Sequence, residues 1–316
     1  MTISKELKVP TIDFCNPELK PGTPQWESTK TQVIQALQEY GIFEAVYDKV
    51  PREAIFNTSK EIFEFPLETK LKTKSTIPMH GYLGQYPQLP AYESLGIADV
   101  LKSESVDSIA NIFWPDGNPD FSNVLKTFSE PLVELDETIK KMILESLGLK
   151  SYIDEFLESY FYNFRFTHYN PALVNGEEGD KPGLSIHTDS GFLTFIFQNS
   201  VNGLEVQTKN GEWIDVNIAP NSLVVIVGDS FMAWTNGRLH SPVHRVTLSE
   251  NSERFSIPLF TVPKEGYIIE PRKELVDEEH PLLFKPYNIL ELYKFVMSKE
   301  GASKAGSEAF KAFCGV

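Results

Sequence analysis

The sequence has little of what several large protein classes require. Only two of its 316 residues are cysteine, Cys15 and Cys314, and they lie at opposite ends of the chain. Cysteine-rich zinc modules are therefore excluded, and a structural disulfide is not expected. The sequence also lacks an apolar run of membrane-spanning length, a G-x-G-x-x-G fingerprint and a phosphate-binding loop. Membrane proteins and the common nucleotide-binding folds are therefore not indicated.

Basic residues are outnumbered by acidic ones. The chain has 29 Lys and Arg residues against 44 Asp and Glu residues, which gives a formal net charge of −15. A nucleic-acid partner would need a basic patch, and an acidic surface repels anionic membranes, so neither partner is expected. An anionic co-substrate would have to be bound by a local cationic group. Residues 1–14 show no secretory or transit signal, so we expect a cytoplasmic protein, and nothing requires more than a monomer.

Apolar spacing changes near residue 160. Before it, apolar residues recur at helical intervals, which predicts helices over 26–40, 51–63 and 121–147, with Pro131 kinking or splitting the last one. After it, short apolar segments alternate with turn residues, as in a sandwich or barrel. The expected strands are 184–198, 203–207, 213–216, 222–227, 244–248 and 255–262, followed by a helix at 287–297. We therefore expect one compact unit with a mainly helical region 1–160, a β core 161–265 and a C-terminal segment 266–316.

Three residues of the β region form a candidate metal site. His187 and Asp189 are two positions apart, so in a strand their side chains point to the same face. His244 supplies a second imidazole from a later strand. Two histidines and one carboxylate form the facial triad of non-haem iron(II) oxygenases, which leaves coordination positions open. The same residues can also bind zinc or form an ordinary hydrogen-bonded polar pair, so the triad alone favours iron only slightly.

Arg254 and Ser256 strengthen the iron interpretation. Arg254 directly precedes the expected strand 255–262 and Ser256 lies within it, so by strand alternation the two share a face, and their neighbours are strongly apolar. An arginine pointing into such a barrel needs a carboxylate partner, and its planar fork suits that group. The alternative is an arginine that faces solvent at a strand edge. A metal triad and a carboxylate clamp in one barrel together favour an iron enzyme that uses a keto acid, because zinc hydrolases have no need of the clamp.

At these residues the sequence resembles the plant 2-oxoglutarate- and iron(II)-dependent dioxygenases. The similarity extends over essentially the whole chain and rests on the ordered motifs HTD at 187–189, HRV at 244–246 and RFS at 254–256. The phrases LKPGTPQW, GDSFMAWTNGRLHSPVHRVTL and ELVDEEHPLLF are most similar to the branch that contains the AOP glucosinolate dioxygenases, glycoalkaloid hydroxylases and deoxypodophyllotoxin synthase.

The resemblance implies a fold, cofactors and an activity. The implied fold is a double-stranded β-helix, a cupin-like jelly roll, with flanking helices. The implied iron(II) ligands are His187, Asp189 and His244, and Arg254 with Ser256 would bind the distal carboxylate of 2-oxoglutarate. The implied reaction consumes dioxygen and 2-oxoglutarate, releases succinate and carbon dioxide, and is stimulated by ascorbate. The substrate could be hydroxylated, desaturated, cyclised or O-demethylated.

One position departs from the family pattern. Most members carry N-Y-Y-P before the H-x-D strand, and the tyrosine next to the proline helps to hold 2-oxoglutarate. Here the segment is His168-Tyr169-Asn170-Pro171, which places Asn170 at that position. An amide can also donate a hydrogen bond to a carboxylate. Asn170 is therefore the first candidate for this role and Tyr169 the second, although Tyr169 also suits the core.

The substrate is less well defined by the sequence. Aromatic and apolar residues in segments that could cover the metal suggest a small apolar or multi-ring substrate. The candidate pocket residues are Tyr82, Leu83, Phe113, Phe231 and Phe260. Two other functions stay open: an iron oxidase of the same fold that does not use 2-oxoglutarate, and a catalytically inactive protein that binds a small molecule.

Overall fold

The computed structural model describes residues 8–174, 181–248, 252–304 and 307–316. The first seven residues, which begin the segment examined for a targeting signal, lie outside these ranges. In the part of the chain that is described, no helix is both long and apolar enough to cross a membrane. Cys15 and Cys314 are free thiols, as expected.

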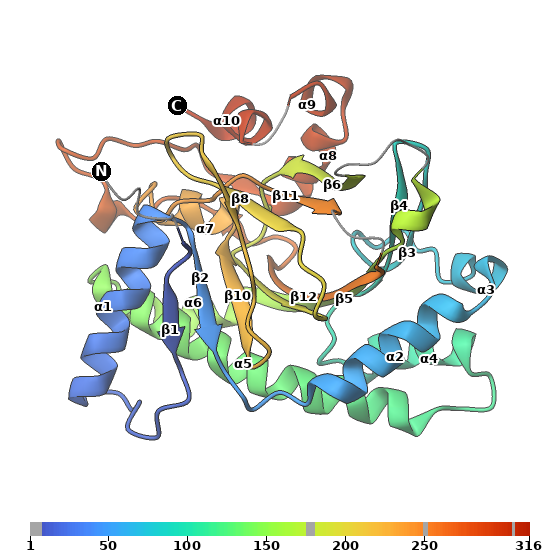
Figure 1. Cartoon of the computed structure of the whole chain (residues 1–316). Helices are drawn as coiled ribbons and strands as arrows, with labels where there is room; N and C mark the ends of the chain where they lie inside the picture. The colour runs from blue at the N-terminus through green and yellow to red at the C-terminus, as the bar shows by residue number, and fades with distance from the viewer. Residues whose placement is uncertain (1–7, 175–180, 249–251, 305–306) are drawn as a thin grey trace, which may run out of the picture.

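The core consists of two β-sheets (Figure 1). The larger sheet contains, in spatial order, β1 (Thr11–Asp13), β2 (Ile42–Val46), β10 (Ser222–Val227), β7 (Leu193–Gln198), β12 (Arg254–Pro263), β5 (Tyr160–Tyr169), β4 (Leu89–Ile97) and β3 (Gly81–Tyr86). The smaller sheet contains β6 (Lys181–His187), β11 (His244–Leu248), β8 (Leu204–Gln207) and β9 (Trp213–Asp215). Neighbouring strands are antiparallel, except for the parallel pair β1–β2.

The two sheets enclose a shared interior. Val224 and Ile226 of β10 belong to the same buried cluster as Leu204 and Val206 of β8 and Val246 of β11. This arrangement is the double-stranded β-helix of a jelly roll, which confirms the predicted fold class. The interior is therefore lined by both sheets, and polar side chains that point into it are shielded from solvent.

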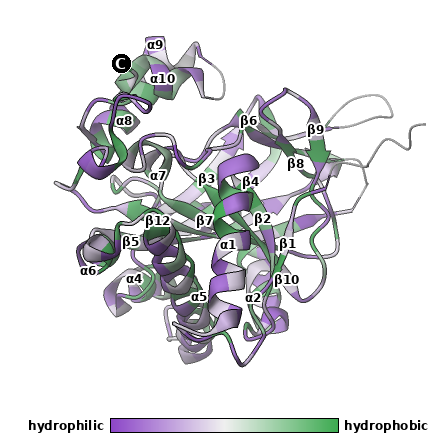
Figure 2. Cartoon of the chain, turned by 90° about the vertical axis from the view of Figure 1, so that its left-hand side faces the viewer, coloured by the Kyte–Doolittle hydropathy of each residue, from purple (hydrophilic) through white to green (hydrophobic). Residues whose placement is uncertain are grey.

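Helices cover the outer face of the larger sheet (Figure 1). They are α1 (Pro24–Glu39), α2 (Arg52–Glu64), α4 (Ser103–Phe113) and the long α5 (Pro119–Ser146). Figure 2 shows hydrophilic residues on α1 and hydrophobic residues along the strands behind it. The shorter helices are α3 (Leu67–Leu71), α6 (Ile153–Glu158), α7 (Asp229–Trp234), α8 (Ile289–Val296), α9 (Lys299–Ala302) and α10 (Glu308–Cys314), and a small hairpin pairs β13 (Ile268–Ile269) with β14 (Tyr287–Asn288).

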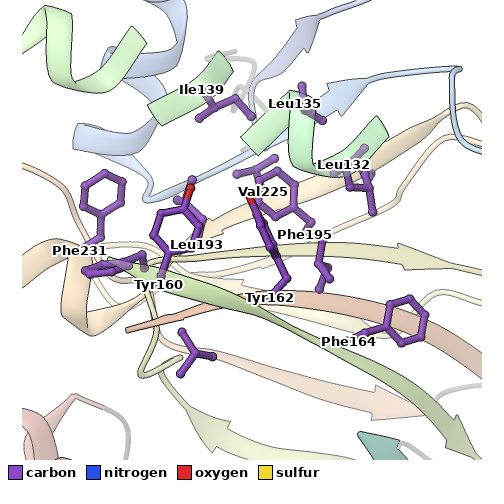
Figure 3. Close-up of a cluster of buried hydrophobic side chains, with 14 of the residues drawn as sticks. Leu132, Leu135, Ile139, Tyr160, Tyr162, Phe164, Leu193, Phe195, Val225 and Phe231 are labelled. Atoms are coloured by element: carbon purple, nitrogen blue, oxygen red, sulfur yellow. The ribbon is translucent and has the colours of Figure 1, made fainter. Parts of the chain in front are cut away.

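Strand β5 separates the helical layer from the interior of the barrel. Tyr160, Tyr162 and Phe164 point toward α5, where they meet Leu132, Leu135 and Ile139 (Figure 3). The hydroxyl groups of Tyr160 and Tyr162 both donate to Asp136 of α5, at 2.8 and 2.9 Å. Because side chains alternate along a strand, Arg165, Thr167 and Tyr169 lie on the opposite face, inside the barrel.

The three helices predicted in the first half are confirmed as α1, α2 and α5. Helix α5 continues through Pro131, whose carbonyl oxygen accepts a hydrogen bond from the Tyr47 hydroxyl at 2.8 Å. The predicted segment 184–198 is wrong as a single strand, because the chain turns between β6 and β7, which belong to different sheets. The mainly helical region 1–160 also contributes β1 to β4, which the apolar spacing did not predict.

Candidate metal centre

His187, Asp189 and His244 come together at one end of the smaller sheet. His187 ends β6 and pairs directly with His244, which begins β11. Asp189 lies just beyond β6, in the turn that leads to β7. One ligand atom from each residue lies within 4.8 Å of the other two. The structure therefore brings together the three residues expected to hold a metal, although Asp189 reaches the site from a turn and not from a strand.

The three side chains direct their free atoms at one point. Nε2 of His187 and Nε2 of His244 each lie 3.8 Å from Oδ1 of Asp189. Nδ1 of His187 is 2.7 Å from the Ser185 carbonyl oxygen, and Nδ1 of His244 is 3.2 Å from that of Pro242. A backbone carbonyl at Nδ1 fixes the tautomer that leaves Nε2 available as a metal ligand. The donor set therefore fits a divalent metal that prefers two imidazoles and one carboxylate.

The surroundings of the site favour its metal-binding protonation state. Burial, and then the neighbouring imidazole of His244, lower the pKa of His187 to about 4, so this ring is neutral at physiological pH. Oδ2 of Asp189 accepts a hydrogen bond from the Thr194 hydroxyl at 2.5 Å, which orients Oδ1 toward the histidines. His187 therefore does not have to lose a proton before it binds a metal.

Asp229 is hydrogen-bonded to the segment that carries the metal ligand Asp189. It was not among the site residues predicted from the sequence. Its backbone N–H donates to the Asp189 carbonyl oxygen at 2.7 Å, and its Oδ2 accepts from the Thr188 hydroxyl at 2.8 Å. Burial raises the pKa of Asp229 to about 7. The feature of the sequence that could have indicated Asp229 is its place in the segment GDSFM, which forms the first turn of α7.

Arg254 and Ser256 lie on the wall of the same cavity. Both are buried, and the Arg254 side chain is 1% exposed. Its Nη2 donates to Oε1 of Gln198 at 3.0 Å, but Nε and Nη1 have no hydrogen-bond partner. Among the described residues no acid lies within ion-pair distance of this guanidinium. A carboxylate ligand that accepts from Nε and Nη1 would neutralise a buried charge that is otherwise costly.

Tyr169 lies beside Arg254 on the cavity wall, and Asn170 is not on the described wall. Tyr169 pairs with Arg254 across β5 and β12, lines the cavity, and places its ring 5.0 Å from the guanidinium carbon. Burial raises the pKa of its hydroxyl above the usual value, so the group stays protonated and can donate. Oδ1 of Asn170 instead accepts from the Ala172 N–H at 3.0 Å in the turn after β5. Of the two candidates, Tyr169 is therefore the one whose side chain lies next to Arg254 inside the barrel.

The cavity measures about 480 Å³, counting its open mouth. Its wall combines the metal site and the clamp with further residues from both sheets: Tyr92, Arg165, Thr167, Leu184, Thr194, Ile196, Leu204, Val246, Pro258 and Phe260. Phe260 was among the expected pocket residues, and Pro258 was not, although it continues the alternation that starts at Arg254 and Ser256 and could have been predicted from it. Arg165 and Thr167 were missed because β5 was not among the expected strands.

Of the five residues expected in the substrate pocket, Phe260 lines this cavity. Tyr82 is buried elsewhere, where its hydroxyl donates to Glu93 at 2.9 Å, and its neighbour Leu83 lies on the same edge strand, β3. Phe113 packs against Phe65 and Trp114, and Phe231 stacks on Phe156. These four lie outside the described cavity wall, and the rings of Tyr82, Phe113 and Phe231 are buried in the main hydrophobic core instead.

Helix α8 lies beside the open end of the barrel. Leu292 and Val296 of this helix border a second cavity, of about 530 Å³, together with His187 and Thr188. Burial, and then the charge of Asp189, raise the pKa of Tyr293 to about 12, and the charge of Arg165 opposes that rise. The hydroxyl of Tyr293 therefore stays protonated at physiological pH.

Comparisons with known proteins agree with this geometry. A family model described as the 2OG-Fe(II) oxygenase superfamily matches residues 160–263, and one described as the non-haem dioxygenase in morphine synthesis N-terminal matches residues 9–102. A probable 2-oxoglutarate-dependent dioxygenase, AOP1.2 of Arabidopsis thaliana, is 42% identical over 98% of both chains. The 2-oxoglutarate-dependent dioxygenase AOP3 of the same plant is 31% identical over 98% of both chains.

Two solved structures have the same fold. The rice dioxygenase for auxin oxidation is 27% identical, with a TM-score of 0.80 over 97% of this chain and 100% of that one. The Arabidopsis thaliana dioxygenase for auxin oxidation 1, in a complex with 2-oxoglutarate, is also 27% identical, with a TM-score of 0.75 over 86% of this chain and 99% of that one.

Proposed function

This chain belongs to the 2OG-Fe(II) oxygenase superfamily and is a 2-oxoglutarate- and iron(II)-dependent dioxygenase, and from that premise we propose that it oxidises a small specialised metabolite of plants. The similarity to plant dioxygenases over nearly the whole chain supports this substrate class. The outcome for the substrate is hydroxylation, desaturation, ring closure or O-demethylation. We further propose that the enzyme is cytoplasmic and monomeric and that ascorbate stimulates it.

In this proposal each polar group of the cavity has a separate task. His187, Asp189 and His244 hold iron through the atoms that converge on one point. Arg254, with hydroxyl groups from Ser256 and Tyr169, binds the distal carboxylate of 2-oxoglutarate. When bound, iron and 2-oxoglutarate would supply the oxidising chemistry, in which one dioxygen is consumed and 2-oxoglutarate is converted to succinate and carbon dioxide as the substrate is oxidised. The protein orients these groups and excludes water from them.

The buried Arg254, which has no acidic partner among the described residues, is the observation that carries the proposal. A triad of two histidines and a carboxylate also suits zinc, and a zinc hydrolase has no use for a buried guanidinium in the same cavity. An iron oxidase without a keto acid could use Arg254 for a substrate carboxylate. That alternative predicts substrate oxidation without succinate, so coupled succinate formation separates the two.

The remaining wall suits an apolar substrate body. Leu184, Ile196, Leu204, Val246 and Phe260 contribute apolar side chains around the metal site. Burying an apolar body against them is favourable by about 25 cal/mol per Å² of area removed from water. We therefore propose a substrate with a mainly apolar skeleton.

The proposal is tested by anaerobic loading with iron(II) and 2-oxoglutarate. Candidate plant metabolites are then added, oxygen is admitted, and succinate is measured together with the oxidised metabolite. The expected result is one bound iron per chain and succinate release that a substrate stimulates. Zinc-loaded protein is the matched control and should release none. Failure to bind iron, or oxidation of a substrate without succinate, would reject the proposal.

A further inference from the structure

A second arginine lies on the wall of the cavity. Arg165 of β5 is 3% exposed and lines the cavity together with the metal site and the Arg254 clamp. Arginine is rarely buried without an acidic partner, because removing its charge from water costs several kcal/mol. Its presence on this wall therefore requires an explanation.

The hydrogen bonds of Arg165 do not neutralise its charge. Nη1 donates to the Ser94 hydroxyl at 2.7 Å, and Nη2 donates to the Met79 carbonyl oxygen at 2.8 Å. Both acceptors are uncharged, and Nε has no hydrogen-bond partner. Within the described ranges no carboxylate lies within ion-pair distance of Arg165. The guanidinium is therefore a buried cation with an unused donor.

Arg165 is held firmly in this position. The Met79 carbonyl oxygen also accepts from Nδ2 of Asn163 at 3.1 Å, and Met79 itself adopts a left-handed backbone with φ of 65°. Gly96 leaves the space that the guanidinium occupies, because a Cβ there would lie 2.7 Å from Nη2. Two strands and the loop before β3 therefore fix the orientation of the side chain, as expected for a residue that recognises a ligand.

The proposed cofactors do not satisfy Arg165. The charges of iron(II) and Arg254 are matched by Asp189 and the two carboxylates of 2-oxoglutarate. Arg165 is four residues before Tyr169, the strand partner of Arg254, which is about 13 Å along β5 at 3.3 Å per residue. The two arginines are therefore attached at separate points of the wall, and in this charge balance one positive charge, that of Arg165, is left over.

We propose that Arg165 binds a carboxylate of the oxidised substrate, so that the substrate is an acid with an apolar body. This inference rests on the proposed function and specifies its substrate. The carboxylate would accept from Nε and a free N–H of a terminal nitrogen, while the apolar body lies against Ile196 and Phe260. Anchoring the acid at this point would place its carbon skeleton near the metal.

The first experiment uses the unmodified protein. It is loaded anaerobically with iron(II) and 2-oxoglutarate, and the binding of indole-3-acetic, phenylacetic and cinnamic acids is compared by calorimetry with that of their methyl esters. The esters keep the apolar body and lose the charge. We expect at least one acid to bind about 10- to 100-fold more tightly than its ester, the range for a hydrogen bond to a charged group. Equal binding of each pair, or no binding by any acid, would overturn the inference.

The second experiment changes the protein. Arg165→Gln should weaken binding of the acid about 10- to 100-fold and leave binding of the ester nearly unchanged, and Arg165→Lys should recover part of the loss because it keeps the charge. Arg238→Gln is the matched control, since it removes one arginine from outside the described cavity wall. Circular dichroism establishes that each variant folds. Weaker binding of 2-oxoglutarate, with unchanged binding of the acid, would assign Arg165 to the co-substrate and overturn the inference.

The two proposals fail in different ways. Unmodified protein that binds no iron and releases no succinate would reject the proposed function. Protein that does both, but does not prefer acids to esters, would reject only the role of Arg165. If Arg165→Gln does not fold, the comparison of acids and esters on the unmodified protein still decides.

Discussion

Asp189 is the one acidic residue on the described cavity wall, and its two oxygens have different tasks. Oδ2 is occupied by the Thr194 hydroxyl, and Oδ1 faces both imidazoles. A carboxylate is the anionic member of the donor set, so it contributes most of the charge complementarity toward a divalent cation. The side chain is therefore expected to matter for metal affinity more than for stability.

Asp189→Ala should lose bound iron. Removing the carboxylate leaves two imidazole ligands, which hold a divalent metal weakly, and we expect iron content after anaerobic reconstitution to fall to near background. Metal content and succinate release are the measurements. Asp215→Ala, which removes an exposed carboxylate from β9, is the control and should bind iron normally. Full turnover by the Asp189→Ala protein would reject the ligand assignment.

Arg254→Gln should weaken the use of 2-oxoglutarate and spare the metal. The variant removes the charged partner of the distal carboxylate, so KM for 2-oxoglutarate should rise about 10- to 100-fold while iron content stays close to normal. Ser256→Ala removes one neutral hydrogen bond and should raise KM less than about 10-fold. Steady-state kinetics over a range of 2-oxoglutarate concentrations provide both values. An unchanged KM in Arg254→Gln would contradict the clamp.

Among the elements, β12 and β5 differ in how well their cavity residues can be predicted from the sequence. Arg254 and Ser256 of β12 could be predicted, because an isolated arginine among apolar residues stands out and strand alternation places Ser256 beside it. Arg165 of β5 could not, because both faces of this strand are buried. Aromatic rings fill the face under α5, and the polar inner face is recognisable only once the opposite sheet is in place.

Long-range pairing explains the other differences from prediction. The segment 184–198 carries apolar residues in both halves, but the two halves pair with different strands, β11 and β10, so the turn at Asp189 depends on partners far away in the sequence. Asn170 was selected because the motif was aligned on its proline, whereas the register of β5 against β12 places Tyr169 beside Arg254. The local sequence pattern around Asn170 gives no information on the register between these two strands.

The edge of the larger sheet is joined to α3 through Glu93. This β4 residue accepts hydrogen bonds from Lys70 at 2.7 Å and from Tyr82 at 2.9 Å, and its other oxygen lies 3.0 Å from Nδ1 of His168. Burial alone would raise the pKa of Glu93, but the hydrogen bonds with His168, Lys70 and Tyr82 outweigh it and lower the pKa below 4.5. The network therefore stabilises the fold only while Glu93 is ionised.

Glu93→Gln should change how stability depends on pH. A carboxyl group whose pKa is lowered by folding contributes stability above its unfolded value, and that contribution is lost as the pH falls through the folded pKa. The free energy of unfolding of the unmodified protein should therefore fall more steeply below pH 4.5 than that of the variant. At neutral pH the variant should be less stable by about 3 kcal/mol, because the buried Lys70 loses its partner.

Urea unfolding at a series of pH values measures both effects. Glu64→Gln is the control, since this exposed residue of α2 makes no comparable network and should follow the unmodified protein. If the free energies of unfolding of Glu93→Gln and of the unmodified protein fall in parallel below pH 4.5, ionised Glu93 does not have the stabilising role assigned to it.

At the scale of the whole molecule, the two halves of the chain share one sheet. Strand β2, from residues 42–46, pairs with β10, from residues 222–227, and β4 pairs with β5. The chain leaves the sheet after β2, builds the helical layer, and returns to it. Neither half can therefore satisfy its backbone hydrogen bonds or cover its apolar face alone.

The shared sheet predicts cooperative unfolding of the whole chain. Because β10 lies between β2 and β7, separating the N-terminal region would expose the edge of the barrel that holds the metal site. Differential scanning calorimetry should therefore show a single transition whose calorimetric and van't Hoff enthalpies agree. A shortened chain that begins at residue 161 should not fold, as judged by near-ultraviolet circular dichroism, since it lacks the covering strands and α5. Two separate transitions, or a folded shortened chain that binds iron, would show that residues 161–316 form an independent unit and that the N-terminal strands are an addition to it.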